Sequence, residues 1–469
     1  MSISRREFLK YCGLTAAAFA LPSLPRVRPQ QAVGTVIDTG APTLLEPSTA
    51  LLVSPAGEAY PSLPWAVVRA GQDLQWQVQV PQTGYYRLAL TWQKGPAGWG
   101  LRAQIMLGDR ILATLYGTAP LPGPVRIEAG TYTLTIRNLA WPLVLVRSLI
   151  VTPTLLACPA PVATFCVVQD WHSDRVPVPP DPDPLPLRGL YNRYLDLNNA
   201  ALRDQEALQG FRQVSPDFLV SNGDSLWWGT PDSIPAFALL TSGLPFPWYA
   251  TMGHHETKRM VGARECIETS WGAALPGGVT SYAFPYAGVL FVFVDSAYFQ
   301  DPLTGKMYPY PPADWVGQLG CTPQIRAWLK SVLSANRAGD RLPVVVFTHH
   351  TLIYRPPTPA LAGGWPWLTS PPYDAANMLA LIGADHCVRA VLTGHAHFQQ
   401  SLTFNNVLHL QGAAMGEGAM TFLRGLIFAD HLEFETYQPV SLTHLLQSSL
   451  SPNSWAVGYP GDINTQVRF

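Results

Sequence analysis

The sequence of 469 residues predicts an α/β domain that follows an all-β sandwich. Between Val36 and Pro153, short strands of alternating apolar and polar residues are separated by turns rich in glycine and proline, which is typical of a β-sandwich. From Ala163 onward, apolar runs of strand length alternate with helical patterns, which indicates an α/β domain. All eleven histidines lie between His172 and His444, so the two parts also differ in composition.

The composition restricts the class of protein. Hydrophobic residues make up 48% of the chain and charged residues 13%, which excludes a disordered chain because disorder requires low hydrophobicity and high net charge. The 45 prolines and 38 glycines exclude a coiled coil or a long helical bundle. The net charge of −1 gives no indication of a nucleic-acid scaffold. No uncharged apolar run reaches the roughly 18 residues of a membrane span, so we expect no transmembrane helix in the mature chain.

Two adjacent arginines stand near the start of the chain. Arg5 and Arg6 belong to the run Ser4–Lys10, with the letters SRREFLK, and the apolar stretch Gly13–Ala20 follows it. This pattern resembles a twin-arginine (Tat) export signal. The resemblance implies that residues 1–20 are a signal peptide, either cleaved or retained as an anchor. It also implies a periplasmic, cell-surface or secreted protein.

Five cysteines follow this segment, and their odd number excludes a complete set of disulfides. Cys266 and Cys321 lie in stretches that read as loops, and we expect that these two could pair. The cysteine spacings match no zinc motif.

The predicted sandwich covers residues 36–155. Its clearest alternating strands are Leu74–Val80, Tyr85–Trp92, Ala103–Leu107 and Tyr132–Ile136. The order of these strands and their turns resembles the carbohydrate-binding jelly rolls that are attached to secreted enzymes. The resemblance implies binding of a cell-surface polysaccharide through exposed aromatic rings, namely Trp65, Trp92, Trp99 and Trp141. Alternatively, these tryptophans fill the core of the sandwich.

The predicted α/β domain covers residues 160–440. Its strands are predicted at Ala163–Gln169, Phe218–Ser221, Val289–Val294, Pro343–Phe347 and Ala390–Thr393. Its helices are predicted at Tyr191–Gln213, Thr322–Asn336 and Tyr373–Ile382. The proline-rich stretch Val176–Leu187 must be a loop. Residues 441–469 lack periodicity and are predicted to form a C-terminal tail.

Side chains that can bind a metal follow five of the apolar segments. They are Asp170 and His172, then Asp224, then His254, His255 and Glu256, then His349 and His350, and finally His395 and His397. Loops at the carboxyl ends of strands are where α/β sheets bind their ligands. Imidazole and carboxylate together bind borderline divalent cations, and a shared aspartate can bridge two of them. The sequence therefore predicts a metal site.

In chain order these blocks read D-x-H, G-D, G-H-H-E, H-H and G-H-x-H, and this order resembles the calcineurin-like metallophosphoesterases from Ala163 to about Gln438. The resemblance implies two mixed sheets that pack together, flanked by helices, and a centre of two divalent or mixed-valence ions of Mn, Fe or Zn. It implies that the first ion binds Asp170, His172, Asp224 and His397. It implies that the second ion shares Asp224 and binds His349, His395 and the residue at the position of His254.

This sequence departs from the family at two positions. The family has asparagine where this chain has His254, so either the His254 imidazole binds the second ion or it turns away and the site is weaker. Purple acid phosphatases of the same superfamily have a metal-binding tyrosine where this chain has Trp227. We therefore expect a colourless protein.

The resemblance implies an exported hydrolase of phosphomonoesters or phosphodiesters. A metal-bridging hydroxide would attack phosphorus, and His255 would assist the leaving group. Glu256 and Asp217 would support the structure, while Asn192 and His350 would contact the ligands or the substrate. The chain contains no G-x-S-x-G elbow and no P-loop. The competing hypothesis is a catalytically weak or inactive exported polysaccharide-binding protein with a phosphoesterase-like domain.

Overall fold

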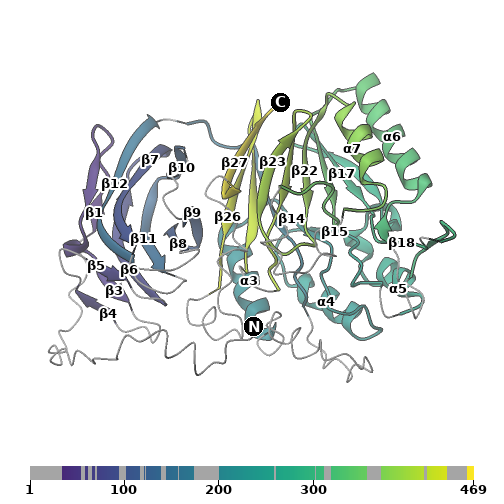
Figure 1. The fold of residues 1–469 in the computed structure, drawn as a ribbon, viewed down its shortest axis with the longest axis horizontal. Helices are drawn as coiled ribbons and strands as arrows, with labels where there is room; N and C mark the ends of the chain where they lie inside the picture. The colour runs from purple at the N-terminus through teal and green to yellow at the C-terminus, as the bar shows by residue number, and fades with distance from the viewer. Residues whose placement is uncertain are drawn as a thin grey trace, which may run out of the picture.

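The computed structural model shows two β-rich bodies side by side, with helices concentrated on the second (Figure 1). It describes residues 34–53, 59–61, 66–68, 71–94, 102–116, 121, 123–138, 144–156, 158–173, 200–257, 260–301, 303–310, 318–355, 371–416, 420–440 and 462–469. The predicted signal peptide, the loop at 176–187, Asn192, Trp65, Trp99 and Trp141 lie outside these residues. Among the described helices, none combines the length and the apolar character that crossing a membrane requires.

The N-terminal body consists of two facing sheets. Its elements are β1 (Thr35–Val36), β2 (Thr43–Leu45), the 3₁₀ turn η1 (Pro47–Thr49), β3 (Leu51–Val53), β4 (Ala59–Pro61), β5 (Ala66–Val68), β6 (Gln72–Val80), β7 (Gly84–Lys94), β8 (Arg102–Leu107), β9 (Arg110–Tyr116), β10 (Val125–Ile127), β11 (Gly130–Asn138) and β12 (Val144–Leu156). One sheet has the order β10-β7-β12-β2, with β5 also on β12, and the other runs β9-β8-β11-β6-β3-β4 with β1 on β6. Buried side chains from both sheets, such as Trp76 and Val146, form one core, and Trp92 packs against it.

The C-terminal body also contains two packed sheets. Its strands are β13 (Ala163–Val168), β14 (Phe218–Asn222), β15 (Trp248–Thr251), β16 (Tyr282–Tyr286), β17 (Val289–Val294), β18 (Tyr298–Gln300), β19 (Met307–Tyr308), β20 (Gln318–Gly320), β21 (Val344–Thr348), β22 (Val388–Thr393), β23 (Gln400–Phe404), β24 (Val407–Gln411), β25 (Phe422–Ile427), β26 (His431–Tyr437) and β27 (Asn464–Arg468). One sheet has the order β16-β17-β21-β22-β24-β23, and the other contains β15-β14-β13-β25-β26. Aromatic rings fill the space between them, as in the edge-to-face pair of Phe165 and Phe291 at 5.3 Å.

Helices cover the outer faces of these two sheets. They are α3 (Ala200–Val214), α4 (Ser233–Ser242), α5 (Ala263–Ser270), α6 (Pro323–Ala338) and α7 (Ala375–Gly383), with the short 3₁₀ turns η3 (Gly272–Ala274) and η4 (Pro276–Gly278). Helix α6 begins where the sequence indicates, because Thr322 accepts a hydrogen bond from the backbone N–H of Ile325 and Pro323 fits the first turn. Helix α4 was not predicted, because its apolar residues cover most of its surface instead of one stripe.

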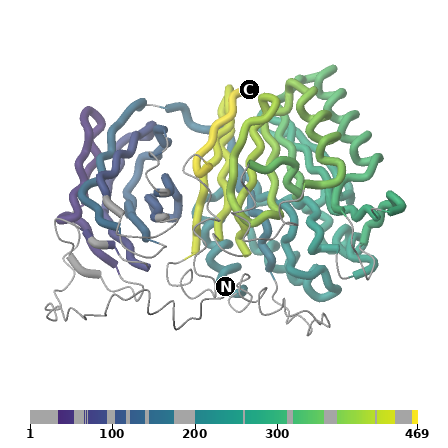
Figure 2. Tube along the Cα trace, in the orientation of Figure 1, coloured from purple at the N-terminus to yellow at the C-terminus, as the bar shows by residue number. Residues whose placement is uncertain are grey.

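The two bodies share one sheet of thirteen strands. Strand β26 of the second body pairs with β9 of the first, with Thr436 opposite Ile111 and Tyr437 opposite Arg110. Strand β27, which lies in the range predicted as a tail, pairs with β26 and lies between the two bodies (Figure 2). The sequence analysis treated the bodies as separate domains, whereas the structure joins them through this pairing.

A buried ion pair reinforces the junction. The guanidinium of Arg110 lies 2.9 Å from the carboxylate of Glu435, and their side chains are only 7% and 2% exposed. Arg110 also donates a hydrogen bond to Asn464 of β27 at 3.2 Å, and Asn464 donates to the carbonyl of Leu112 at 2.9 Å. Removing one partner of a buried pair leaves an uncompensated charge, so we expect the N-terminal body to stabilise the C-terminal one.

The predicted pairing of Cys266 with Cys321 is wrong. Both residues are free thiols, as are the other cysteines of the described residues. Cys321 lies in the core beneath α6 and α7, whereas Cys266 packs against the separate core between the two large sheets. A disulfide would have to cross from one core to the other.

We expect Arg110→Met to lower the free energy of unfolding by about 1.5–3 kcal/mol, the range for a lost hydrogen bond to a charged group, because the buried Glu435 carboxylate then keeps only Arg424, at 3.4 Å. Urea denaturation monitored by circular dichroism measures this change. Arg87→Met, which alters an exposed arginine of β7, is the matched control and should change stability by less than about 0.5 kcal/mol. A loss below about 1 kcal/mol for Arg110→Met, as for an exposed ion pair, would show that this ion pair does not stabilise the junction.

Candidate metal centre

The residues that can bind a metal gather at one edge of the C-terminal body. They follow β13, β14, β15, β21 and β22, whose carboxyl ends meet there because β13–β15 are parallel in one sheet and β21–β22 in the other. Four groups have ligand atoms within 4.8 Å of one another: Asp170, His172 and His397; Asp170, Asp224 and His349; Asp224, His254 and His255; and His254, His349, His350 and His395. The groups share members, so they form one continuous cluster.

The first group has the geometry that a metal ion requires. The Nε2 atoms of His172 and His397 face each other at 3.3 Å, and Nε2 of His397 lies 3.3 Å from Oδ1 of Asp170. Two ligands that each lie 2.0–2.1 Å from a tetrahedral zinc ion are separated by about 3.3 Å. His172 and Asp170 are fully buried. The three residues therefore fit a shared ion.

Asp224 lies between this group and the remaining histidines. Its Oδ2 atom is 2.9 Å from Nε2 of His349 and 3.2 Å from Nδ1 of His254. Nε2 of His349 also lies 3.8 Å from Oδ1 of Asp170. The fully buried Asp224 carboxylate is thus placed to serve two ions, one on each side.

One loop orients three of the histidines. Three carbonyl groups between the last residue of β14, Asn222, and residue 227 accept hydrogen bonds from Nδ1 of His172 (Leu226, 3.4 Å), His255 (Trp227, 2.6 Å) and His349 (Asn222, 3.0 Å). Because a carbonyl oxygen can only accept, each Nδ1 carries the hydrogen, and the lone pair of the neutral ring is on Nε2. Such outer contacts are typical of metal-binding histidines.

Backbone strain marks the same residues. Five of them have a positive φ, which costs about 1–3 kcal/mol for a residue other than glycine and persists only where the surroundings enforce it. They are Asp170 (46°), His172 (49°), Asp224 (49°), His395 (72°) and His397 (58°). Strained residues cluster at functional sites, so this pattern supports the same assignment independently of the sequence motifs.

Glycines next to these residues permit the close packing. A Cβ atom at Gly253 would lie 2.1 Å from Oδ1 of Asp224, and one at Gly223 would lie 2.5 Å from Nδ1 of His349. Any larger residue would displace the ligand side chain. The glycine of each motif is therefore a steric requirement of the centre.

Glu256 joins two of the loops. Its buried carboxylate accepts hydrogen bonds from the backbone N–H groups of Asp224 at 3.1 Å, Gly253 at 3.0 Å and Ser225. Burial and the charge of Asp224 raise the pKa of Glu256 to about 7. These contacts agree with the structural role predicted for this residue.

The charges of the centre favour a cation. Burial lowers the pKa of His172 to about 3 and that of His350 and His395 well below the usual value, so these rings are neutral and can bind a metal. Burial also opposes protonation of His349, but Asp224 and Asp170 outweigh it and raise its pKa to about 9. The carboxylates thus attract positive charge to the point where Nε2 of His349 lies.

The structure brings the seven predicted metal ligands and His255 into this cluster. Asp217 lies elsewhere, since its carboxylate accepts a hydrogen bond from the N–H of Thr164 at the opposite end of β13, which is a structural role. His350, predicted only as a neighbour of the ligands or substrate, lies among the ligand atoms. The sequence analysis missed the contact of Ser296 with His350 and the role of the Trp227 carbonyl. The role of His350 could have been predicted from the H-H motif, in which His350 directly follows the predicted ligand His349.

No protein-family model matches the sequence, and no curated protein matches it either. Similar solved structures include a dimetal phosphatase from Danio rerio, with 16% identity and a TM-score of 0.46 over 60% of this chain and 98% of that chain. They also include a phosphopantetheinyl hydrolase from Mycobacterium tuberculosis, with 14% identity and a TM-score of 0.30 over 54% of this chain and 89% of that chain. The CBM6 module of a laminarinase from Zobellia galactanivorans has 14% identity and a TM-score of 0.18 over 24% of this chain and 98% of that chain. Identities and TM-scores this low do not establish a shared function, so the residues of the centre must carry that inference.

Proposed function

We propose that the protein is a metal-dependent hydrolase of phosphoric esters, a phosphatase or phosphodiesterase, with two metal ions at this centre. The observation that carries the proposal is the position of Asp224 between two groups of ligand atoms. Asp170, His172 and His397 would hold one ion together with Asp224. His254, His349 and His395 would hold the other, and Asp224 would belong to both.

When bound, two cations supply positive charge that neutralises phosphate oxygens and lowers the pKa of a water molecule. The side chains of the chain then have separate tasks. Asp224 and Asp170 balance the charge of the cations. The buried imidazoles keep water away from the side of each ion that faces the protein core. His255, with its ring next to that of His172 at 4.9 Å, would act as an imidazolium: its Nδ1–H stays on the Trp227 carbonyl, and its Nε2–H would give a proton to the departing oxygen.

Aromatic side chains hold His255 in position. Its ring stacks on Trp227 with centroids 4.5 Å apart and lies 5.5 Å from the ring of Trp228. Both tryptophans are 8% exposed. Since the Trp227 carbonyl also accepts a hydrogen bond from Nδ1 of His255, a single residue fixes both the plane of the ring and the nitrogen, Nε2, that would exchange a proton with the substrate.

We also propose that the protein is exported and that its N-terminal body binds polysaccharide. The SRREFLK run supports export. The strand pattern and the β-rich architecture of this body support polysaccharide binding, whereas Trp92 packs against the sandwich core. If the centre binds metal without hydrolysing esters, the binding function becomes the better account of the whole chain.

Hydrolysis of bis-p-nitrophenyl phosphate and p-nitrophenyl phosphate tests the proposed function. We expect turnover that a chelator abolishes and that Mn, Fe or Zn restores. Asp224→Asn should remove at least nine-tenths of it, because the amide lacks the charge that balances two cations. Asp340→Asn, in an exposed segment after α6, is the control and should keep full activity. Metal-independent turnover, or an active Asp224→Asn variant, would contradict the proposal.

The role of His255 can be separated from that of the ligands by the leaving group. We expect His255→Ala to lower the turnover of phenyl phosphate by about 10²–10⁴-fold, the range of general acid catalysis. The loss should be smaller for p-nitrophenyl phosphate, since p-nitrophenolate leaves without a proton. Bound metal, measured by mass spectrometry, should persist. An equal loss for both esters, or loss of metal, would make His255 a ligand or a structural residue.

A further inference from the structure

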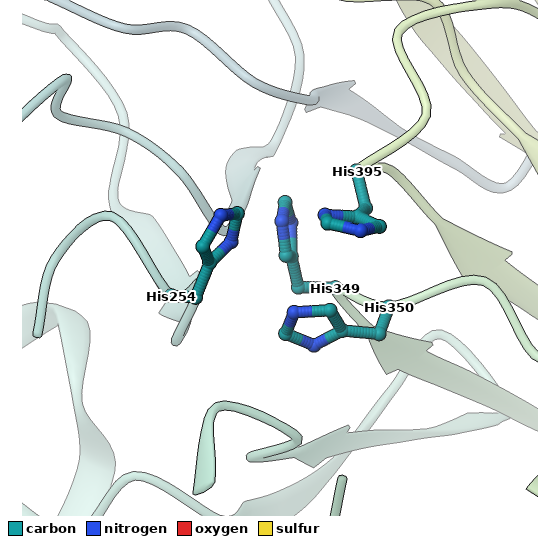
Figure 3. Close-up of side chains that lie close together, drawn as sticks. All are labelled: His254, His349, His350 and His395. Atoms are coloured by element: carbon teal, nitrogen blue, oxygen red, sulfur yellow. The ribbon is translucent and has the colours of Figure 1, made fainter. Parts of the chain in front are cut away.

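We propose that four imidazoles, those of His254, His349, His350 and His395, hold the second ion beside the shared Asp224 carboxylate, so that His350 is a metal ligand. This inference rests on the proposed function and deepens it by assigning a nitrogen-rich set of ligands. Three loops contribute the four rings, and Figure 3 shows the ring of His349 between those of His254 and His395, with the ring of His350 below them. Each ring has one nitrogen within 4.8 Å of a nitrogen of every other ring.

The spacing of the rings is that of a tetrahedron. Four imidazoles bound to one zinc ion at 2.0–2.1 Å have centroids about 3.2 Å from the ion and about 5.2 Å from one another. The six observed centroid distances run from 4.7 to 6.0 Å. A square-planar set would instead have four distances of about 4.5 Å and two diagonals of about 6.4 Å. Here the longest distance (His254–His349) and the shortest (His350–His395) are opposite edges, which a square does not allow.

His350 is oriented as a ligand. Its Nδ1 lies 2.8 Å from the hydroxyl of Ser296, which also accepts a hydrogen bond from the His350 backbone N–H at 3.3 Å. Ser296 is buried just beyond the end of β17. The ring is thereby fixed with Nε2 directed to the other side, and an outer hydrogen bond of this kind is typical of metal-binding histidines.

Two of the facing nitrogens lack hydrogen-bond partners. Nε2 of His350 and Nδ1 of His395 are buried and have none among the described residues, and the two side chains are at most 6% exposed. Nε2 of His349 lies 2.9 Å from Oδ2 of Asp224, the carboxylate proposed to bridge the two ions. Leaving a buried polar atom without a partner is unfavourable, and one cation would satisfy these two nitrogens together with Nε2 of His349.

The proposed set predicts that the two sites differ in metal preference. The first ion would have two imidazoles and the carboxylates of Asp170 and Asp224, whereas the second would have four imidazoles and only the shared carboxylate of Asp224. Imidazole suits Zn, Fe, Ni and Cu, while Mn and Mg prefer oxygen. The second site should therefore select zinc or iron even where manganese occupies the first.

The test measures zinc binding to the metal-free full chain by equilibrium dialysis and mass spectrometry. We expect wild-type protein to bind two zinc ions. His350→Ala should weaken one of them by about 100-fold or more, and Ser296→Ala should weaken the same ion by about 10–100-fold. His409→Ala removes a buried histidine of β24 that lies outside the cluster, and it should leave both ions unchanged.

Cobalt substitution gives a second readout that does not depend on activity. The visible absorption of the cobalt-loaded second site should change in His350→Ala and not in His409→Ala. Two zinc ions of unchanged affinity in folded His350→Ala, with an unchanged cobalt spectrum, would overturn the inference while leaving the proposed function intact. If wild-type protein binds two zinc ions in this way but hydrolyses no phosphoric ester, the inference stands and the proposed function fails. If the wild-type chain binds no metal, both fail.

Discussion

The Glu256 carboxylate is the contact on which the geometry of the centre depends. By accepting the N–H groups of Asp224, Ser225 and Gly253, it fixes the loop after β14 against the loop after β15. The first of these loops supplies Asp224 and the three carbonyls that orient His172, His255 and His349. Because three N–H groups from two loops converge on the two oxygens of one side chain, this anchor can hold Asp224 at a φ of 49°.

The buried charges of the centre have a consequence for the whole body. Isolated carboxylates are costly in an apolar interior unless they are paired or bind metals. Here Asp170 and Asp224 are fully buried, and burial keeps the imidazoles of His172, His350 and His395 neutral. Cations satisfy the carboxylates and the lone pairs at once, which is why we regard the cluster as a metal centre and not as a structural network.

Much of this arrangement could be predicted from the sequence, because the carboxyl ends of parallel strands meet at one edge and bring Asp170, Asp224 and His395 together. The role of His350 could not, since adjacent residues of a strand point to opposite faces. His349 and His350 reach the same cluster only because both lie beyond the end of β21. The shared sheet could not be predicted either. The pairing of Thr436 with Ile111 joins residues far apart in the chain and does not affect the local alternation of apolar and polar residues.

Anomalous diffraction from crystals of the metal-loaded protein tests the central claim most directly. The account predicts two anomalous peaks about 3.5–4 Å apart, as in two-metal hydrolases, with the Asp224 carboxylate between them. His172 and His397 should contact one peak, and His349 and His395 the other. A single peak, or two peaks that do not share Asp224, would contradict it.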